Sequence, residues 1–254
     1  LGVNMRKGST IQVKIDKTEF PSTGIGTAEG KKIYVKGAFP GQTVSGRVKK
    51  KREAFAELKL MSVDERADYE IAPSCEHFGI CGGCTSQNLT YEKQLELLSE
   101  EFKALFEEAN IPLNNYKGIV GSKEQWEYRN KMEFTFGDFE KGGELTLGMH
   151  MKGKSFGIIT VDKCLIVDED FRTLIKATVD YFRAKNLPYY RVMKREGYLR
   201  HLVIRKAINT GELMVNLVTT TQIDFDLSEY VEILKNQEYK GNLVSVLHTE
   251  NNSF

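Results

Sequence analysis

The sequence predicts an α+β protein that begins with a small OB-like β-barrel. Three observations support this fold class. Residues 1–65 contain short runs of alternating apolar and polar residues, separated by turns with Gly and Pro. A cysteine-rich segment lies within residues 66–90, and residues 91–254 combine helical and strand periodicity. We therefore expect a barrel, a cysteine loop and a central α+β domain with a mainly antiparallel sheet.

Four strands are predicted in the first domain, over residues 10–15, 31–37, 43–51 and 54–63. In the first of them Ile11, Val13 and Ile15 alternate with polar residues, which is the period of a half-buried strand. Strands at this spacing, in a segment of about sixty residues, are typical of a closed OB-type barrel. The stretch GIGTAEG (24–30) lacks the spacing of a dinucleotide-binding loop, and we interpret it as a turn.

Charge is unevenly distributed along the chain. The net charge is +1, but residues 1–62 hold 13 Lys and Arg against 5 Asp and Glu. Residues 126–206 hold 16 against 11, and the segments between and after these two are acidic. The basic first domain and the basic middle segment are compatible with binding a polyanion such as RNA. Alternatively, these residues are ordinary solvent-exposed charges.

The segment CEHFGICGGC (75–84) contains three of the four cysteines, Cys75, Cys81 and Cys84, and the fourth is Cys164. The spacing C-x5-C-x2-C with one distant partner favours a metal site, because a structural disulfide is rare in a reducing compartment. A redox-active C-x-x-C pair usually opens a helix after a strand, and glycines fill the gap here. We expect a [4Fe–4S] cluster, with zinc as the alternative.

Gly82 and Gly83 suit a tight loop that turns backbone N–H groups toward the sulfur atoms. His77 lies inside the loop and could be a ligand. We expect it to be a solvent-side neighbour instead, because four cysteines complete a cluster.

The second domain is predicted to start with a helix from Thr90, its N-cap, to a point before Pro112. Six apolar residues fall on one stripe of this helix: Tyr91, Leu95, Leu98, Phe102, Leu105 and Phe106. Strands are expected over 128–136, 144–151, 155–160, 197–207, 212–219 and 242–248, and helices over 168–186 and 226–237. The first two of these strands are joined by a hairpin connection.

No apolar run is long enough to span a bilayer, and the first residues have no signal-peptide h-region. We expect a cytoplasmic protein with no membrane partner. The sequence indicates no oligomeric state.

The basic barrel, CEHFGICGGC, YEKQLE, YRNKMEFTF, the lone Cys164 and LRHLVIRK together resemble the iron–sulfur 23S ribosomal RNA (uracil-5-)-methyltransferases. In that family the barrel is a TRAM domain and the cysteines bind a [4Fe–4S] cluster. Members continue for roughly as much chain again, into a Rossmann-like domain that holds S-adenosylmethionine, a nucleophilic cysteine and a general base. Nothing in this sequence matches that domain. The resemblance therefore implies the RNA-binding and iron–sulfur portion of such an enzyme, without the catalytic domain, without catalytic or S-adenosylmethionine-binding residues, and inactive alone.

For the whole enzyme, the resemblance implies that a thiolate adds to carbon 6 of a uridine, carbon 5 takes the methyl group and a base removes its proton. The uridine must leave its stack for this chemistry, so a platform that holds ribosomal RNA is the expected role of this chain. The expected RNA contacts are Lys49, Lys50, Lys51, Arg52, Arg129, Lys131, Arg200 and Arg205. Each of them could equally be a surface or ion-paired cation.

Three other functions compete with this interpretation. Radical methylthiotransferases also combine a TRAM barrel with an iron–sulfur site, but their spacing is C-x3-C-x2-C and their barrel is C-terminal. A free-standing RNA-binding module, stabilised by zinc or a cluster and without enzymatic activity, fits these residues. A redox sensor or electron carrier would need a solvent-accessible cluster. The transfer-RNA branch of the uracil methyltransferases is expected to lack both barrel and cluster, which favours ribosomal RNA.

Overall fold

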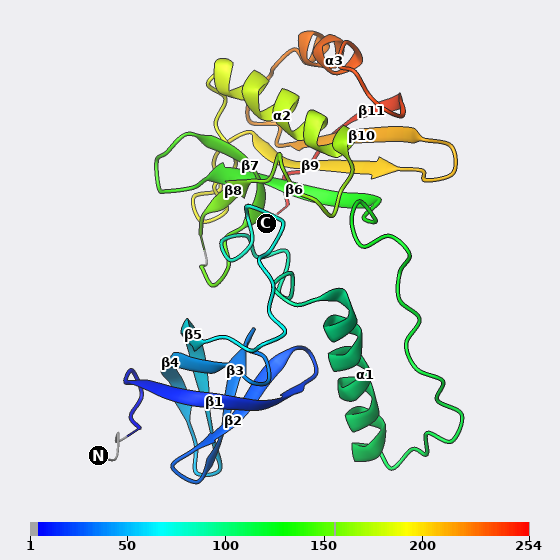
Figure 1. The fold of residues 1–254 in the computed structure, drawn as a ribbon. Coiled ribbons are helices and arrows are strands. Elements are labelled where there is room, and N and C mark those ends of the chain that lie inside the picture. Colours follow the sequence, from blue (N-terminus) through cyan, green and yellow to red (C-terminus); the bar gives the residue numbers. More distant parts are fainter. Residues whose placement is uncertain (1–4, 155, 254) are drawn as a thin grey trace. The chain divides into compact units, whose positions relative to one another are not determined.

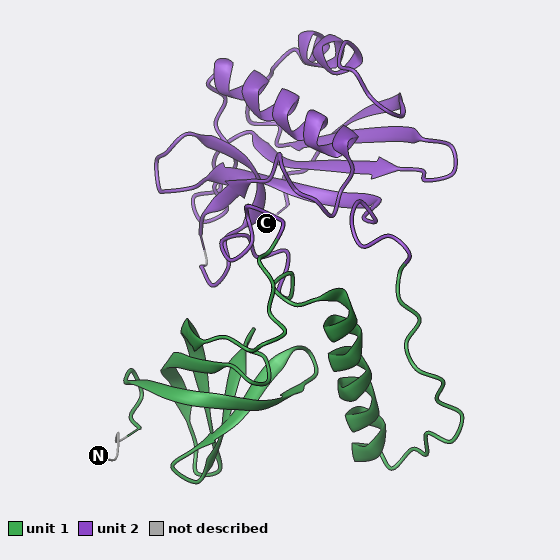
Figure 2. Ribbon diagram, in the orientation of Figure 1, with its two compact units in different colours: residues 1–73, 86–122 green, residues 74–85, 123–254 purple. Residues whose placement is uncertain are grey.

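The computed structural model describes residues 5–154 and 156–253 and divides into two units (Figure 1, Figure 2). Unit 1 comprises Leu1–Pro73 and Ser86–Ser122, and unit 2 comprises Ser74–Thr85 and Lys123–Phe254. Residues 1–4 of the predicted barrel, Ser155 at the start of a predicted strand, and residue 254 lie outside the described residues. This division differs from the predicted domains 1–65, 66–90 and 91–254, because the cysteine loop joins the second unit while the helix after it joins the first. The domain assignment itself stays a prediction.

Unit 1 contains a closed five-stranded barrel in the order β1-β2-β3-β5-β4. The strands are β1 (Thr10–Glu19), β2 (Thr23–Ala28), β3 (Lys31–Lys36), β4 (Thr43–Lys51) and β5 (Phe55–Glu65). β3 and β5 pair in parallel and the other neighbours are antiparallel. The alternating residues of β1, with those of β3 and β4, point inward and form the barrel core around Ile15, Ile33 and Val44. These inward side chains fill the interior of the barrel, as alternate residues do in a small closed barrel.

The interpretation of residues 24–30 as a turn is wrong, since most of them form β2. Gly24 and Gly26 hid the strand because they carry no side chain for the alternation. A Cβ at Gly26 would stand 2.0 Å from the carbonyl oxygen of Lys14 on β1, and one at Gly24 would stand 2.6 Å from that of Ala38. These glycines therefore mark a close approach of backbones within the barrel.

The helix of unit 1, α1 (Tyr91–Glu108), begins where predicted. The Thr90 side chain accepts a hydrogen bond from the Lys93 amide at 3.3 Å. The predicted apolar stripe is wrong as the buried face. Leu97 is buried with Phe39 and Leu89, whereas Leu98, Phe102 and Leu105 are exposed. Helical spacing alone did not indicate which side of α1 packs on its own unit.

Unit 2 is a six-stranded sheet in the order β11-β10-β9-β6-β7-β8. Its strands are β6 (Lys131–Asp138), β7 (Leu145–His150), β8 (Ile158–Thr160), β9 (Leu199–Lys206), β10 (Glu212–Thr219) and β11 (Asn242–Glu250). All neighbours are antiparallel except β10 and β11, which pair in parallel. Helices α2 (Glu169–Ala184) and α3 (Ser228–Lys235) lie on one face of this sheet (Figure 1). The core between helices and sheet includes Phe134, Phe171, Phe182, Leu202 and Tyr230.

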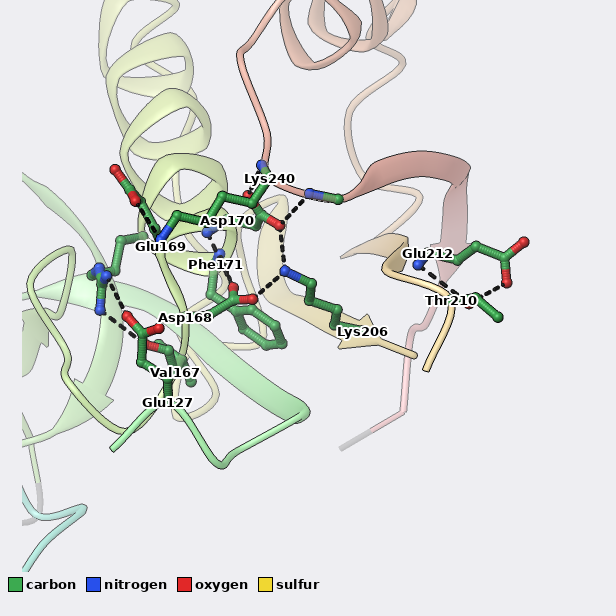
Figure 3. A network of polar contacts seen from close by, with 12 residues as sticks. Glu127, Val167, Asp168, Glu169, Asp170, Phe171, Lys206, Thr210, Glu212 and Lys240 are labelled. Atoms are coloured by element: carbon green, nitrogen blue, oxygen red, sulfur yellow. Dashed lines mark hydrogen bonds and ion pairs between the residues drawn. The ribbon is translucent and has the colours of Figure 1, made fainter. Parts of the chain in front are cut away.

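A buried polar network joins three elements of unit 2 at the start of α2 (Figure 3). Asp168 is the N-cap, and its side chain accepts from the amides of Asp170 and Phe171. The Lys206 ammonium, at the end of β9, forms ion pairs with Asp168 and, at 2.6 Å, with Asp170. Asp170 also accepts from the backbone amides that precede β11, those of Lys240 and Gly241. Its carboxylate is fully satisfied by these donors.

Within the described residues, no helix combines the length and apolar character needed to cross a membrane.

Candidate metal centre and basic surfaces

The cysteine loop, residues 74–85, is anchored to the end of β7 in unit 2. Cys81 forms an isolated antiparallel bridge with Met151. The Gly82 amide donates to the carbonyl of His150 at 2.9 Å, and the Lys152 amide donates to that of Ile80 at 2.7 Å. A Cβ at Gly82 would stand 2.9 Å from the same His150 oxygen. The loop therefore pairs through one bridge with the residues at the end of β7, and Gly82 permits the close approach of the two backbones.

Cys164 lies in the connection between β8 and α2, on the same unit. Arg172 of α2 fixes this connection, because its Nη1 donates to the carbonyls of Cys164 at 3.1 Å and Val167 at 2.9 Å. An ion pair of 3.1 Å joins Lys163 to Glu76. These two residues immediately adjoin Cys164 and Cys75, so the distant cysteine lies beside the loop that carries the other three.

The four thiols influence one another electrostatically. Among the described residues no disulfide joins them. The pKa of Cys164 is raised to about 11, mainly by burial and in part by negative charge on Cys75 and Cys84. Burial also raises the pKa of Cys81, again with contributions from Cys84 and Cys75. Such thiols are poor nucleophiles at neutral pH, which disfavours a redox-active dithiol. A bound metal would invert this preference, because coordination deprotonates a thiol.

Backbone N–H groups donate to the sulfur atoms of two of the four cysteines, Cys81 and Cys164. The Gly83 amide donates to the sulfur of Cys81 at 3.3 Å, and the amides of Ile166 and Val167 donate to that of Cys164. N–H donors to cysteine sulfurs are usual around iron–sulfur clusters. No group of three or more His, Cys, Asp or Glu side chains in the described residues is arranged to hold a metal ion, so the cluster and its zinc alternative both stay predictions.

The expectation that His77 faces solvent is wrong. Only 8% of this residue is exposed, and its Nε2 atom is buried with no hydrogen-bond partner in the described part of the chain. Its carbonyl accepts from the amides of Ile80 and Cys81, so His77 is also part of the turn that carries Cys81.

The motif YRNK lies beside the cysteine site. The Arg129 amide donates to Ile166 at 2.9 Å, and the Glu127 amide donates to Leu165 at 2.9 Å. Glu127 also pairs with Arg172 at 2.8 Å. The pKa of Tyr128 is raised by burial first and then by Cys84 and Cys164, while Arg129 lowers it. Tyr128 and Arg129 are therefore close neighbours of the cysteines.

The predicted RNA contacts of unit 2 fall into two groups. Lys131 on β6 and Arg205 on β9 are direct register partners, and both are exposed. They form a basic pair on the sheet face opposite α2, with exposed Arg129 two residues before Lys131. Arg200 is engaged structurally instead. Its Nη1 donates to the carbonyls of Asn251 at 2.9 Å and Ser253 at 2.7 Å, and its guanidinium lies 4.5 Å from the centre of the Tyr190 ring.

The predicted contacts of unit 1 lie at the end of β4 and in the turn after it, and all four side chains are exposed. Lys50 pairs with Glu57 at 3.1 Å and lies 5.2 Å from the centre of the Phe55 ring. Lys51 donates to the carbonyl of Met5 at 2.5 Å. Lys49 and Arg52 have no side-chain partner among the residues that the structure describes, which leaves them available to a phosphate.

No family model matches this chain. Comparison with known proteins finds relatives that match almost all of it and are themselves longer. A protein of Clostridium tetani named an uncharacterized RNA methyltransferase is 57% identical over 98% of this chain and 55% of its own length. Another of that name, from Clostridium acetobutylicum, is 53% identical over 97% of this chain and 54% of its own length. The relatives are named RNA methyltransferases. The chain spans about half the length of the curated relatives it matches.

The fold is similar to that of a solved enzyme. The tRNA (uracil-54, C5)-methyltransferase of Pyrococcus abyssi, solved with S-adenosyl-L-homocysteine, matches with a TM-score of 0.66 and 21% identity. The match covers 95% of this chain and 52% of that one. At this identity the likeness concerns the fold alone.

This match corrects the predicted fold class. We expected an OB-like barrel, an α+β domain with a mainly antiparallel sheet, and the absence of a Rossmann-like domain. The likeness extends over 95% of this chain, and neither the structure nor the comparisons show such a domain to be missing. The expected absence of the barrel from transfer-RNA enzymes is wrong for this one, since a match over 95% of this chain includes most of both units.

Sequence reasoning missed the residues that support the cysteines. The Glu76–Lys163 pair carried one signal, because opposite charges adjoin two of the predicted ligands. Arg172 carried none, since an arginine in an amphipathic helix gives no indication of the carbonyls that it contacts.

Proposed function

We propose that this chain is the RNA-binding and cluster-bearing portion of an S-adenosylmethionine-dependent RNA methyltransferase that modifies carbon 5 of uridine in 23S ribosomal RNA. The observation that carries the proposal is the 57% identity, over 98% of this chain, to a protein named an RNA methyltransferase. The uridine specificity follows from the resemblance of the motifs and is supported by the fold of a uracil-C5 enzyme. The ribosomal substrate rests on the resemblance alone.

Within this proposal the four cysteines bind a [4Fe–4S] cluster. The cluster links the loop 74–85 to the segment between β8 and α2 that contains Cys164. The Glu76–Lys163 pair and the N–H donors to Cys81 and Cys164 support this assignment. Methyl transfer from a sulfonium to carbon needs no electron, so the cluster's role is structural. The chain has four cysteines. If all four cysteines are ligands of the cluster, no cysteine of this chain is left to attack carbon 6 of the uridine. The role of the chain is then to hold the RNA.

RNA binding is assigned to the exposed cations of each unit. Lys49 and Arg52 would contact phosphates from the barrel, and Lys131 with Arg205 would do so from the open sheet face. Arg129 would contact RNA next to the cysteine site. Arg200 is withdrawn from this set because its guanidinium already holds the backbone of Asn251 and Ser253.

Fluorescence anisotropy with the full chain tests the proposal. We expect a fragment of 23S ribosomal RNA to bind more tightly than transfer RNA of equal length at the same salt concentration. The double variant Lys131→Ala/Arg205→Ala should weaken binding, whereas Lys176→Ala, an exposed cation on α2, should leave it unchanged. Tighter binding of transfer RNA would overturn the ribosomal substrate, and no binding of either RNA would overturn the function.

A further inference from the structure

The cysteine loop contains a second inward-facing side chain besides its buried thiol. Of residues 74–85, Cys75 and His77 are the two that are buried. Glu76 between them is exposed and pairs with Lys163. Residues 76–80 form a turn, in which the Phe78 amide donates to the carbonyl of Cys75 and the Cys81 amide donates to that of His77. His77 is therefore enclosed in the turn between two of the proposed ligands, Cys75 and Cys81.

The Nε2 atom of His77 is an unpaired polar atom in this enclosed place. It is shielded from water and has no hydrogen-bond partner in the described part of the chain. Buried polar atoms are nearly always paired, and an exception calls for a specific explanation such as an ion or group that the protein binds. A neutral imidazole whose Nε2 carries the proton is a donor, and a sulfur atom of a cluster is an acceptor.

We propose that His77 is a positioning residue of the cluster, whose Nε2–H donates a hydrogen bond to one of the cluster's sulfur atoms. This inference rests on the proposed cysteine-held cluster. The backbone and the side chain of His77 then both support the cluster. The His77 carbonyl accepts from the Ile80 and Cys81 amides and thereby fixes the turn that contains Cys81. Hydrogen bonds to the sulfurs of a cluster stabilise its reduced, more negative form and raise its reduction potential.

Two substitutions separate donation from packing and from ligation. His77→Gln keeps an N–H donor at a similar reach, and His77→Met fills a similar volume without a donor. Each full-length variant is purified anaerobically beside the wild-type chain. Iron and sulfide are counted, the reduction potential is measured by spectroelectrochemistry, and the loss of visible absorbance to an iron chelator is timed.

We expect all three proteins to contain the cluster as purified. His77→Met should lose it to the chelator faster, on the order of tenfold, and should have a more negative potential, while His77→Gln should stay close to the wild type. Equal rates and potentials in all three would overturn the role of His77 alone. Loss of iron from both variants during purification would also overturn it, by making His77 a ligand. A wild-type chain without iron would overturn the proposed cluster together with this inference.

Discussion

Lys206 shows how much one residue contributes to unit 2. Its ammonium is the common partner of Asp168 and Asp170, and the side chains of Lys206 and Asp170 are 12% and 2% exposed. Removing one partner of a buried pair leaves the other charge uncompensated. Without the Lys206 ammonium between them, the carboxylates of Asp168 and Asp170 would repel each other.

Lys206→Met should therefore lower the free energy of unfolding by about 3–5 kcal/mol, measured by urea denaturation at pH 7. The matched control is Lys176→Met, which breaks the exposed pair with Asp180 on the same helix. That pair should contribute about 0–1 kcal/mol. Equal unfolding midpoints for the two variants would contradict the importance of the network.

The same network gives stability a defined pH dependence. Burial alone would raise the pKa of Asp170, but Lys206 and the amides of Lys240 and Gly241 outweigh it and hold the pKa below its ordinary value of 3.8. A carboxyl with a lowered folded-state pKa contributes stability above its unfolded-state pKa, and that stability is lost as the pH falls through the folded-state value.

Acid titration of stability should consequently differ between wild type and Asp170→Asn. The variant should be less stable at pH 7, and its free energy of unfolding should fall less steeply than that of the wild type below about pH 4. Parallel curves for the two proteins over this range would show that Asp170 is not held ionised by its partners.

At the scale of elements, the cysteine loop depends on its backbone pairing with the residues at the end of β7. A Cβ at Gly82 would collide with backbone, at 2.9 Å from the His150 oxygen, and backbone cannot yield as a flexible side chain can. A Cβ at Gly83 would meet its nearest atom, the Cys81 sulfur, at the ordinary contact distance of 3.4 Å. The two neighbouring glycines are therefore predicted to differ in their tolerance of a side chain.

Gly82→Ala should lower the free energy of unfolding by about 1–3 kcal/mol, and Gly83→Ala should cost less. Urea denaturation of both variants, followed by circular dichroism, measures the difference. A larger loss for Gly83→Ala would mean that the approach to β7 does not restrict the loop.

The elements that could be predicted are those in which the pattern of apolar and polar side chains matches the buried and exposed positions. The pattern of residues 168–186 predicted a helix that the structure confirms as α2, because the buried face of this helix is mainly apolar. β2 was missed because its glycines carry no such signal. The buried side of α1 was missed because its partners, Phe39 and Leu89, lie outside the helix.

The candidate site was predictable in its residues and not in its surroundings. The spacing of the cysteines selected Cys75, Cys81, Cys84 and Cys164, and the structure places all four on unit 2. The inward position of His77 and the engagement of Arg200 depend on residues far away in sequence, and no local pattern carries them. The assignment of the cysteines to a cluster stays a prediction.

At the scale of the whole molecule, RNA binding should depend on salt in a way that separates available from engaged cations. Each phosphate contact contributes about 0.7 to the slope of log affinity against log salt for single strands. Lys49→Ala should reduce the slope by about this amount. Lys50→Ala should reduce it less, because Lys50 is paired with Glu57.

Anisotropy titrations at several salt concentrations measure these slopes. If both variants change the slope equally, or neither changes it, the barrel end of β4 is not a phosphate-binding surface.

The cluster is expected to hold unit 2 together across a gap of eighty residues between Cys84 and Cys164. Replacing Cys164 with Ser should therefore remove the cluster and loosen the loop and its surroundings. A Cys164→Ser variant that lacks the cluster yet is as stable as the wild type and binds RNA as well would contradict this structural role.

Metal analysis of the anaerobically purified full chain shows whether the four cysteines hold a cluster. We expect a brown protein with about four iron and four sulfide per chain, and a colourless one when Cys164 is replaced by Ser. A colourless wild-type chain that carries one zinc or no metal would contradict this expectation, as would a Cys164→Ser variant with the full complement of iron.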